Sequence, residues 1–163
     1  MAEQNNSTAL LQALERLLHS YEIETLLTEA DGLPMLKARL TELGRAEGEA
    51  LMEICLVPMA AAAQQPQGHL LQFYTTTASN LDEANIAPAL SALNPINLRC
   101  PVGAFLVYEP LRQLCHKHMV VLAGEQSLWT AQAEAALLAA VETIDRFFDE
   151  TVIIADDAAN DLS

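Results

Sequence analysis

Basic residues are scarce in this chain, which has eight lysines and arginines against 22 aspartates and glutamates and a formal net charge of −14. Proteins that bind nucleic acids need basic side chains to replace the counterions of the phosphates. Anionic membrane surfaces attract proteins through the same kind of residue. We therefore expect neither a nucleic-acid partner nor a membrane partner. The excess of acidic residues favours solubility and can steer the protein toward a basic partner.

Cysteine is also rare, and long apolar segments are missing. Cys55, Cys100 and Cys115 are odd in number and widely spaced, and no Cys-x-x-Cys pair occurs. This pattern favours a reducing compartment over a disulfide framework. The apolar runs are too short for a membrane-spanning helix. The first residues, MAEQNNSTALLQ, have neither the basic nor the apolar region of a signal peptide. We therefore expect a cytoplasmic protein.

The common motifs of phosphate binding and acyl transfer are absent. The sequence has no Gly-x-Gly-x-x-Gly or Walker-type loop, and no serine lies in a Gly-x-Ser-x-Gly motif. Gly103 is isolated, and in a strand such a glycine permits a bulge or the close approach of another backbone. The sequence therefore predicts no catalytic residue, no metal ligand and no cofactor.

What the chain does have is the size and composition of one globular domain. It has 163 residues, of which 52% are hydrophobic and 18% are charged. A domain of this length buries about 68–70% of the surface that its unfolded chain exposes, so it can build a core without metals or disulfides. No internal repeat or long linker divides it. We predict a single domain over residues 1–163, with a short frayed tail from about residue 157.

A helix is predicted at the start of the chain. N-cap candidates at residues 5–7 precede leucines at helical spacing. The same apolar face is extended or followed by Ile23, Leu26 and Leu27. The helix is expected to end at Asp31-Gly32.

The next segments favour strands. Residues 33–43 fit either a helix or a half-buried strand. Pro34 and the turn between Gly44 and Gly48 leave too little room for a typical helix, so we predict a strand over residues 35–42. Two further strands are predicted in ALMEICLVPM and HLLQFYTTTA, and the Gln, Pro and Gly residues between them predict a loop.

A second helix is predicted after these strands. Asn80 and Glu83 have the spacing of a capping box. Pro88 either kinks the helix that they open or lies in a restarted first turn capped by Asn85. The helix is expected to end by Asn94-Pro95.

The chain closes with a hairpin and a long helix. PVGAFLVYEP and RQLCHKHMVVLAG predict two strands joined by a turn near Glu109-Pro110. Thr130 is the expected cap of the last helix, whose apolar stripe consists of Leu137, Val141, Ile144, Phe148 and Val152. The order of the elements is therefore α-β-β-β-α-β-β-α, and the fold class is α+β.

Cys115-His116-Lys117-His118 is the local cluster whose side chains are the strongest candidates for metal binding or catalysis. On a strand, His116 and His118 point to one face and Cys115 points to the other. Two histidines at this spacing can bind one metal ion, but a third ligand is needed, and His69 or a carboxylate would have to supply it. The alternative is a solvent-facing pair on a half-exposed sheet. A small metal-dependent or hydrolytic enzyme using His116 and His118 is the alternative function.

Glu53 and the thiols are weaker candidates. Glu53 interrupts an apolar strand, and it is either an acid with a raised pKa in a cleft or a residue that is paired with arginine or points out at an edge. A Cys–His nucleophile is disfavoured because Cys115 and His116 are adjacent and diverge on a strand. Cys55 and Cys100 lie in apolar or turn contexts, where cysteine behaves as a small hydrophobe.

The order of elements and one stretch, ALNPINLRCPVGAFLVYEP, resemble the YbjN-like proteins, which share the fold of type III secretion chaperones. The matching positions are Leu93, Asn94, Asn97, Gly103 and Phe105. The predicted central strand pair and the acidic terminal helix are also similar, so that the resemblance covers residues 7–156. The resemblance implies an antiparallel sheet with packed helices. It also implies a homodimer that binds an extended segment of another protein, and it places no catalytic residue.

The function predicted from the sequence is therefore non-enzymatic. Strands such as LMEICLVPM and GAFLVYE are apolar on both faces, and a small sheet with helices on one side cannot cover all of that surface. Exposed apolar patches usually mark interaction sites. We expect a chaperone-like or regulatory protein-binding module that acts as a homodimer and binds another polypeptide. A purely structural dimer is a third possibility.

Overall fold

The computed structural model of the chain describes residues 2–58 and 69–160. The helices are α1 (Ala2–Ser20), α2 (Ile86–Asn97) and α3 (Trp129–Asn160), and the strands are β1 (Glu24–Ala30), β2 (Leu33–Leu43), β3 (Gly48–Pro58), β4 (His69–Ala78), β5 (Ala104–Tyr108) and β6 (Gln113–Leu122). The loop predicted between β3 and β4 lies outside the described residues.

The strands form one antiparallel sheet in the order β1-β2-β3-β4-β6-β5. The predicted α+β class is confirmed, and the order of elements differs from the predicted one by a single additional strand, β1. Among the described helices, none combines the length and the apolar character needed to cross a bilayer.

The additional strand β1 corrects the prediction for Ile23, Leu26 and Leu27. The first helix ends at Ser20, because Glu22 adopts a left-handed conformation (φ 60°). The N–H groups of Glu22 and Ile23 donate to the carbonyls of His19 and Leu18, which is the Schellman pattern of a helix C-terminus. The three apolar residues therefore lie in or just before a strand.

Asp31-Gly32 forms a hairpin turn and does not stop a helix. Both residues have positive φ angles, 51° and 77°, as a two-residue type I′ turn requires. The flanking residues Ala30 and Leu33 are paired, and β1 therefore runs directly back into β2. The strand predicted over residues 35–42 is confirmed as part of β2.

The beginning of α2 follows one of the two alternatives predicted for Pro88. A short 3₁₀ turn covers Glu83–Asn85, and α2 restarts at Ile86 with Asn85 at the N-cap position, although the Asn85 side chain makes no capping hydrogen bond. Pro88 therefore lies in a restarted first turn, where its missing N–H costs nothing. The capping box predicted from Asn80 is not formed, because Asp82 precedes the 3₁₀ turn and makes no side-chain capping bond.

The ends of α2 and α3 differ from the predicted ones. α2 continues past Asn94-Pro95 to Asn97, because Pro95 falls in the last turn and interrupts little of the helix. α3 begins at Trp129 after a 3₁₀ turn, so Thr130 lies inside its first turn and is not the cap. α3 extends to Asn160, beyond residue 157, where the frayed tail was expected to begin. The predicted hairpin turn after Tyr108 is confirmed.

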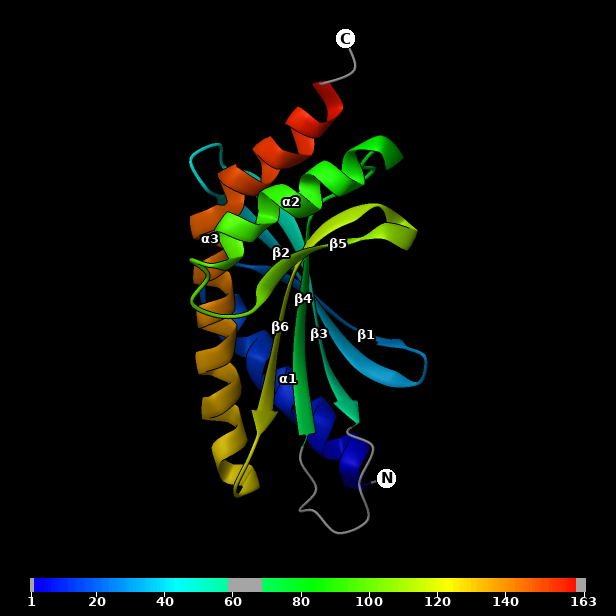
Figure 1. Cartoon of the computed structure of the whole chain (residues 1–163). Coiled ribbons are helices and arrows are strands. Elements are labelled where there is room, and N and C mark those ends of the chain that lie inside the picture. The colour runs from blue at the N-terminus through cyan, green and yellow to red at the C-terminus, as the bar shows by residue number, and fades with distance from the viewer. Residues whose placement is uncertain (1, 59–68, 161–163) are drawn as a thin grey trace.

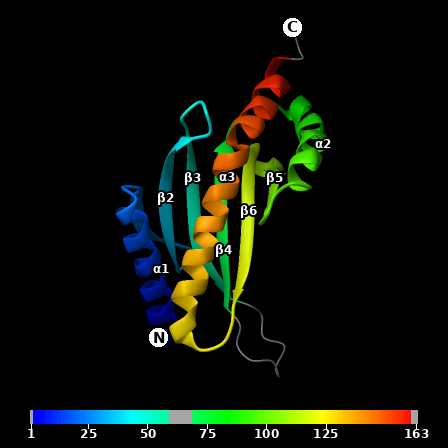
Figure 2. The same ribbon diagram turned by 90° about the vertical axis from the view of Figure 1, so that its left-hand side faces the viewer.

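Helices α1 and α3 cover one face of the sheet, and α2 packs against β5 and the last turns of α3 (Figures 1 and 2). Two apolar cores hold these layers together. The larger core lies between α1, α3 and strands β2, β3 and β4, and it includes Phe148 of the predicted stripe. The smaller core joins α2, β5 and β6 to Phe147 of α3, a fully buried residue that the predicted stripe does not contain.

Candidate functional site

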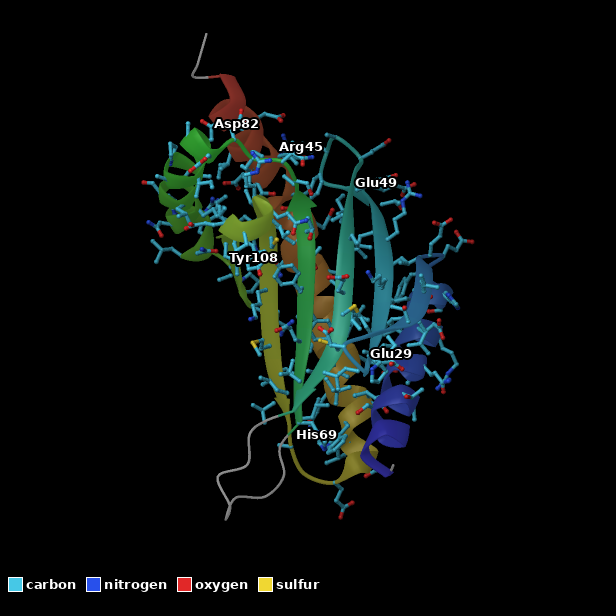
Figure 3. All side chains as sticks on the ribbon, turned by 90° about the vertical axis from the view of Figure 1, so that its right-hand side faces the viewer. Glu29, Arg45, Glu49, His69, Asp82 and Tyr108 are labelled. Carbon is cyan, nitrogen blue, oxygen red and sulfur yellow. The ribbon has the colours of Figure 1, made fainter. Side chains whose placement is uncertain are left out.

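The opposite face of the sheet is not covered by any helix of the described chain. The edges of the sheet, β1 and β5, reach away from the helices, so that this open face is concave (Figure 1). Figure 3 looks onto it, with β5 and Tyr108 at one side and β1 and Glu29 at the other. We call this surface the concave face.

The strand register determines which side chains meet on the concave face. Residues directly opposite in an antiparallel sheet share one face. One row across the sheet is Lys37, Glu53, Tyr74, Lys117 and Ala104, and the next row is Arg39, Leu51, Thr76, Cys115 and Leu106. A third row is Met35, Cys55, Gln72 and Met119.

Large apolar side chains are exposed on this face. Half of the exposed large hydrophobic residues in the described part of the chain lie here: Leu26, Leu51, Tyr108, Leu111, Met119 and Val121. Monomeric proteins rarely expose such residues together unless they form an interaction site. The composition of the strands predicted exposed apolar surface, and half of the exposed large hydrophobic residues of the described chain lie on the concave face.

A groove of about 760 Å³ runs over the centre of the concave face. Its floor comes from β3, β4 and β6, and its walls come from the two hairpin turns, with Asp31 on one side and Leu111 on the other. A second hollow of about 480 Å³ adjoins it and shares Leu51, Thr76 and Gln113. The two hollows together make an elongated depression along the strands.

Ion pairs lie along the floor and the rim of the groove. Lys37 Nζ contacts Glu53 Oε1 at 2.9 Å across β2 and β3. Glu53 is thus paired, as one of its two predicted alternatives required, although its partner is a lysine and β3 is not an edge strand. At the rim, the Arg39 guanidinium donates to both carboxylate oxygens of Glu49 and also approaches Glu24 at 3.7 Å.

The thiols on this face are poor nucleophiles. Cys115 is fully buried beneath the groove, and its Sγ lies 3.9 Å from Thr76 Oγ1. Burial raises the pKa of Cys115 and also that of Cys55, so both thiols stay protonated near neutral pH. Burial also raises the pKa of the Tyr74 phenol, and its hydrogen bond with Cys115 acts in the same direction. These groups favour binding chemistry over covalent catalysis.

His116 and His118 lie on the other face of β6, as predicted from their spacing relative to Cys115. The alternative that they form a solvent-facing pair is wrong, because this face packs against the helices. His116 is fully buried, its Nε2 lies 3.0 Å from the Val102 carbonyl, and its ring packs on Phe105 at 4.9 Å. The half-buried His118 ring stacks on Phe73 at 5.9 Å.

No third ligand joins the two histidines in the described part of the chain. His69 shares their face, but it is paired with Leu122 and its ring packs against Trp129. His69 lies four positions before Phe73, the partner of His118, which is about 13 Å along a strand. The described residues contain no group of three His, Cys, Asp or Glu side chains that could hold a metal ion.

The residues around β5 have structural roles. A Cβ atom on Gly103 would lie 2.5 Å from the Lys117 carbonyl and 2.6 Å from His116 Nε2. The predicted close approach at Gly103 is therefore confirmed. Asn97 binds both backbone groups of Phe105, accepting from its N–H at 2.7 Å and donating to its carbonyl at 2.9 Å. The Asn97 amide thus replaces a neighbouring strand at the edge of β5.

Sequence reasoning did not find the groove, because its residues come from five strands and two turns and have no local motif. Alternating apolar and polar residues in β3, β4 and β6 contain a partial signal, since the positions facing away from the core are themselves often apolar. No protein-family model and no curated protein matches this chain.

Proposed function

We propose that the protein is a non-enzymatic, chaperone-like or regulatory module that binds a segment of another polypeptide in the groove of the concave face. The observation that carries this proposal is the elongated groove bordered by exposed apolar side chains on the face that the helices leave open. Filling such a groove removes apolar surface from water, which is the main favourable contribution in most protein associations. The resemblance to YbjN-like proteins implies a role of the same kind.

The shape of the groove suits a polypeptide. The two hollows share Leu51, Thr76 and Gln113 and follow the direction of the strands. An extended segment can place alternate side chains into pockets along such a surface. Polar groups of Gln72, Thr76 and Gln113 line the same surface and can bind main-chain groups of a bound segment.

Selection of binding peptides from a displayed library of random dodecapeptides, with the wild-type protein as the target, tests this function. Leu51→Asp places a carboxylate in the floor of the groove, and it should lower the affinity for selected peptides by about tenfold or more, because binding would have to desolvate that charge and would lose the apolar contact of Leu51. Leu138→Asp on α3 is the matched control, because the two leucines are exposed to a similar degree, 43% and 46%. Peptides that bind both variants equally, or no selected peptides at all, would refute a binding role for the groove.

We also propose that two copies associate through the outer surface of α2. The segment from Ile86 to Leu98 contains no charged residue, and its outward side exposes Leu90 and Leu98. Two chains that each carry a charge of −14 repel one another, so that contact through an uncharged surface is the least unfavourable. Twofold dimers are the commonest closed assembly.

Sedimentation equilibrium at micromolar concentration tests the dimer. The wild-type protein should have twice the mass of one chain, and Leu98→Asp should have the mass of one chain. Leu128→Asp, at another exposed leucine outside α2, should remain dimeric. A wild-type mass of a single chain would contradict the dimer.

A cytoplasmic location is part of the same proposal, supported by three cysteines that are free in the described structure.

A further inference from the structure

The charges of the groove carry a more specific inference, which rests on the proposed function. The chain has two lysines, Lys37 and Lys117, and both lie on the concave face. Lys37 is paired with Glu53 at 2.9 Å. Lys117 makes no ion pair with any described residue, although the chain has 22 acidic residues.

The register explains why Lys117 lacks a partner. Tyr74 and Ala104 lie directly opposite it on the two neighbouring strands. Its remaining neighbours on the concave face are also uncharged: Gln72, Thr76, Leu106, Cys115 and Met119. Glu53 lies two strands away, about 9–10 Å between backbones, and its carboxylate already binds Lys37.

A segment that fills the groove must therefore meet this ammonium group. In the free protein, Lys117 is half-buried and water solvates its charge. A purely apolar occupant would remove that water and leave a buried, unpaired cation, which is strongly unfavourable. An occupant with a carboxylate at this point would instead form a charge-assisted hydrogen bond in a partly dry environment.

We infer that the bound segment contains an acidic side chain that pairs with Lys117, flanked by apolar residues that contact the walls of the groove. Leu106 and Leu111 provide apolar surface on the side of the groove toward β5 and its turn, and Leu51 on β3 provides it on the other side of β4. Asp31, at the opposite wall, disfavours a second acidic residue there. The groove thus selects for one carboxylate at a defined position, while the rest of the protein repels acidic partners in general.

Peptides selected from the random dodecapeptide library test this inference. Those whose binding depends on Leu51 should share an Asp or Glu between apolar residues. Replacing that acid by its amide should weaken binding by about tenfold, the loss expected for a charge-assisted contact. Lys117→Gln should cause the same loss for the acidic peptide, and the amide peptide should bind Lys117→Gln at least as tightly as wild type, because the variant has no cation to bury unpaired. Arg16→Gln, on α1, changes the net charge equally and should leave binding unchanged.

A charge reversal provides the second arm. Selection on Lys117→Glu should enrich Lys or Arg where the wild type enriches an acid, and circular dichroism of each variant should match the wild type. Leu51-dependent peptides without an acid, or with unchanged affinity for Lys117→Gln, would overturn the inference and leave the proposed function standing. Absence of any Leu51-dependent peptide would overturn both.

Two other occupants would give distinct results. Octanoate that binds with Lys117 dependence, in the absence of selected peptides, would assign the groove to a small amphipathic acid and overturn the inference. A halved sedimentation mass of Leu51→Asp, with Leu138→Asp unchanged, would assign the groove to a second copy of the chain and would also overturn it.

Discussion

His116 lies in the core of the protein, where burial disfavours a charged ring. Its ring is fully buried against Phe105, and its Nδ1 has no hydrogen-bond partner among the described residues. Burial lowers the pKa of His116, and the nearby His118 acts in the same direction, while the hydrogen bond to the Val102 carbonyl opposes the shift. Burial also lowers the pKa of His118. Both rings are therefore neutral in the folded protein at neutral pH.

This arrangement predicts a loss of stability in weak acid. Below the ordinary histidine pKa of 6.5, the unfolded chain binds protons that the folded chain does not. The free energy of unfolding should thus fall as pH decreases, by up to about 1.4 kcal/mol per pH unit for each histidine that stays neutral. Urea titrations of wild type and His116→Gln should show a shallower dependence in the variant below pH 6.5, and a constant difference well above it. Equal slopes would contradict the prediction.

Gly48 marks a place where the backbone approaches a ring too closely for any side chain. A Cβ atom there would lie 2.1 Å from Cε1 of Phe148. Gly48→Ala should lower the free energy of unfolding by about 1–3 kcal/mol, the usual cost of overpacking a core. The measurement is urea denaturation, and the control is Gly48→Ala combined with Phe148→Leu. A cost of Gly48→Ala that does not shrink in the Phe148→Leu background would show that the ring is not the cause.

Helix α3 is the element that joins the two cores, through Phe148 on one side and Phe147 on the other. It is also bound to the turn after β2, because Asp145 and Asp149 accept hydrogen bonds from the backbone N–H groups of Gly44 and Arg45. The helix therefore fixes the turn between β2 and β3.

Phe148→Ala should test the contribution of α3 to the core. The ring is 3% exposed, and truncation of a buried phenylalanine costs about 3–5 kcal/mol. Chemical denaturation should show a loss in this range with cooperative unfolding retained. Leu138→Ala, on the exposed side of α3, should change the stability little. An unchanged midpoint for Phe148→Ala would show that this side of α3 does not form the core.

Helix α2 is tied to the edge of the sheet by the Asn97 side chain, which binds the N–H and the carbonyl of Phe105. Asn97→Ala should destabilise the protein by about 1–3 kcal/mol, because both backbone groups lose their partner at a partly buried site. Asn94→Ala, on the same helix but exposed, should have little effect. Hydrogen exchange at the Phe105 amide gives an independent readout, and unchanged protection in Asn97→Ala would contradict the role of this contact.

The sequence predicted most elements where the breaks between them are chemically distinctive. Pro34 and the glycines around the β2–β3 turn isolate β2, and the strand was identified although its leucines also fit a helix. The strand β1 was missed, because leucines at helical spacing continue past Ser20 and the left-handed residue that ends α1 is Glu22, not glycine. Asp31-Gly32 was the available signal, since Asp-Gly between apolar runs favours a hairpin.

The candidate site was less predictable than the fold. The residue types of Glu53, His116 and Cys115 made them candidates for chemistry. His116 and Cys115 are buried, however, and the charge of Glu53 is neutralised by Lys37. Lys117 was part of the cluster that sequence reasoning singled out, but only the register shows that its neighbours are uncharged. Such a property depends on which strands are adjacent, and adjacency of β4 and β6 is not visible in local sequence.

The molecule as a whole carries an excess of negative charge that opposes its own compaction. With a net charge of −14, the folded chain concentrates repulsion that the unfolded chain can relax. Sodium chloride should therefore raise the free energy of unfolding at pH 7. Most of the rise should occur as the salt concentration increases to about 0.15 M, at which the Debye length has fallen to about 8 Å. Thermal or urea denaturation measures this. Near the isoelectric pH of about 4.4 the same salt series should give no such rise, and equal responses at both pH values would contradict the explanation.

The strand order has a consequence for how the protein folds. Among the described strands, β4 and β6 are the one paired couple that is not consecutive in the chain, and residues 79–112 lie between them. Hairpins between consecutive strands close short loops and form quickly, whereas this pairing must wait for a longer loop to close. Tyr74 and Lys117 face each other across that same boundary. The groove of the concave face would thus be completed only in a late step of folding, after the hairpins between consecutive strands have formed.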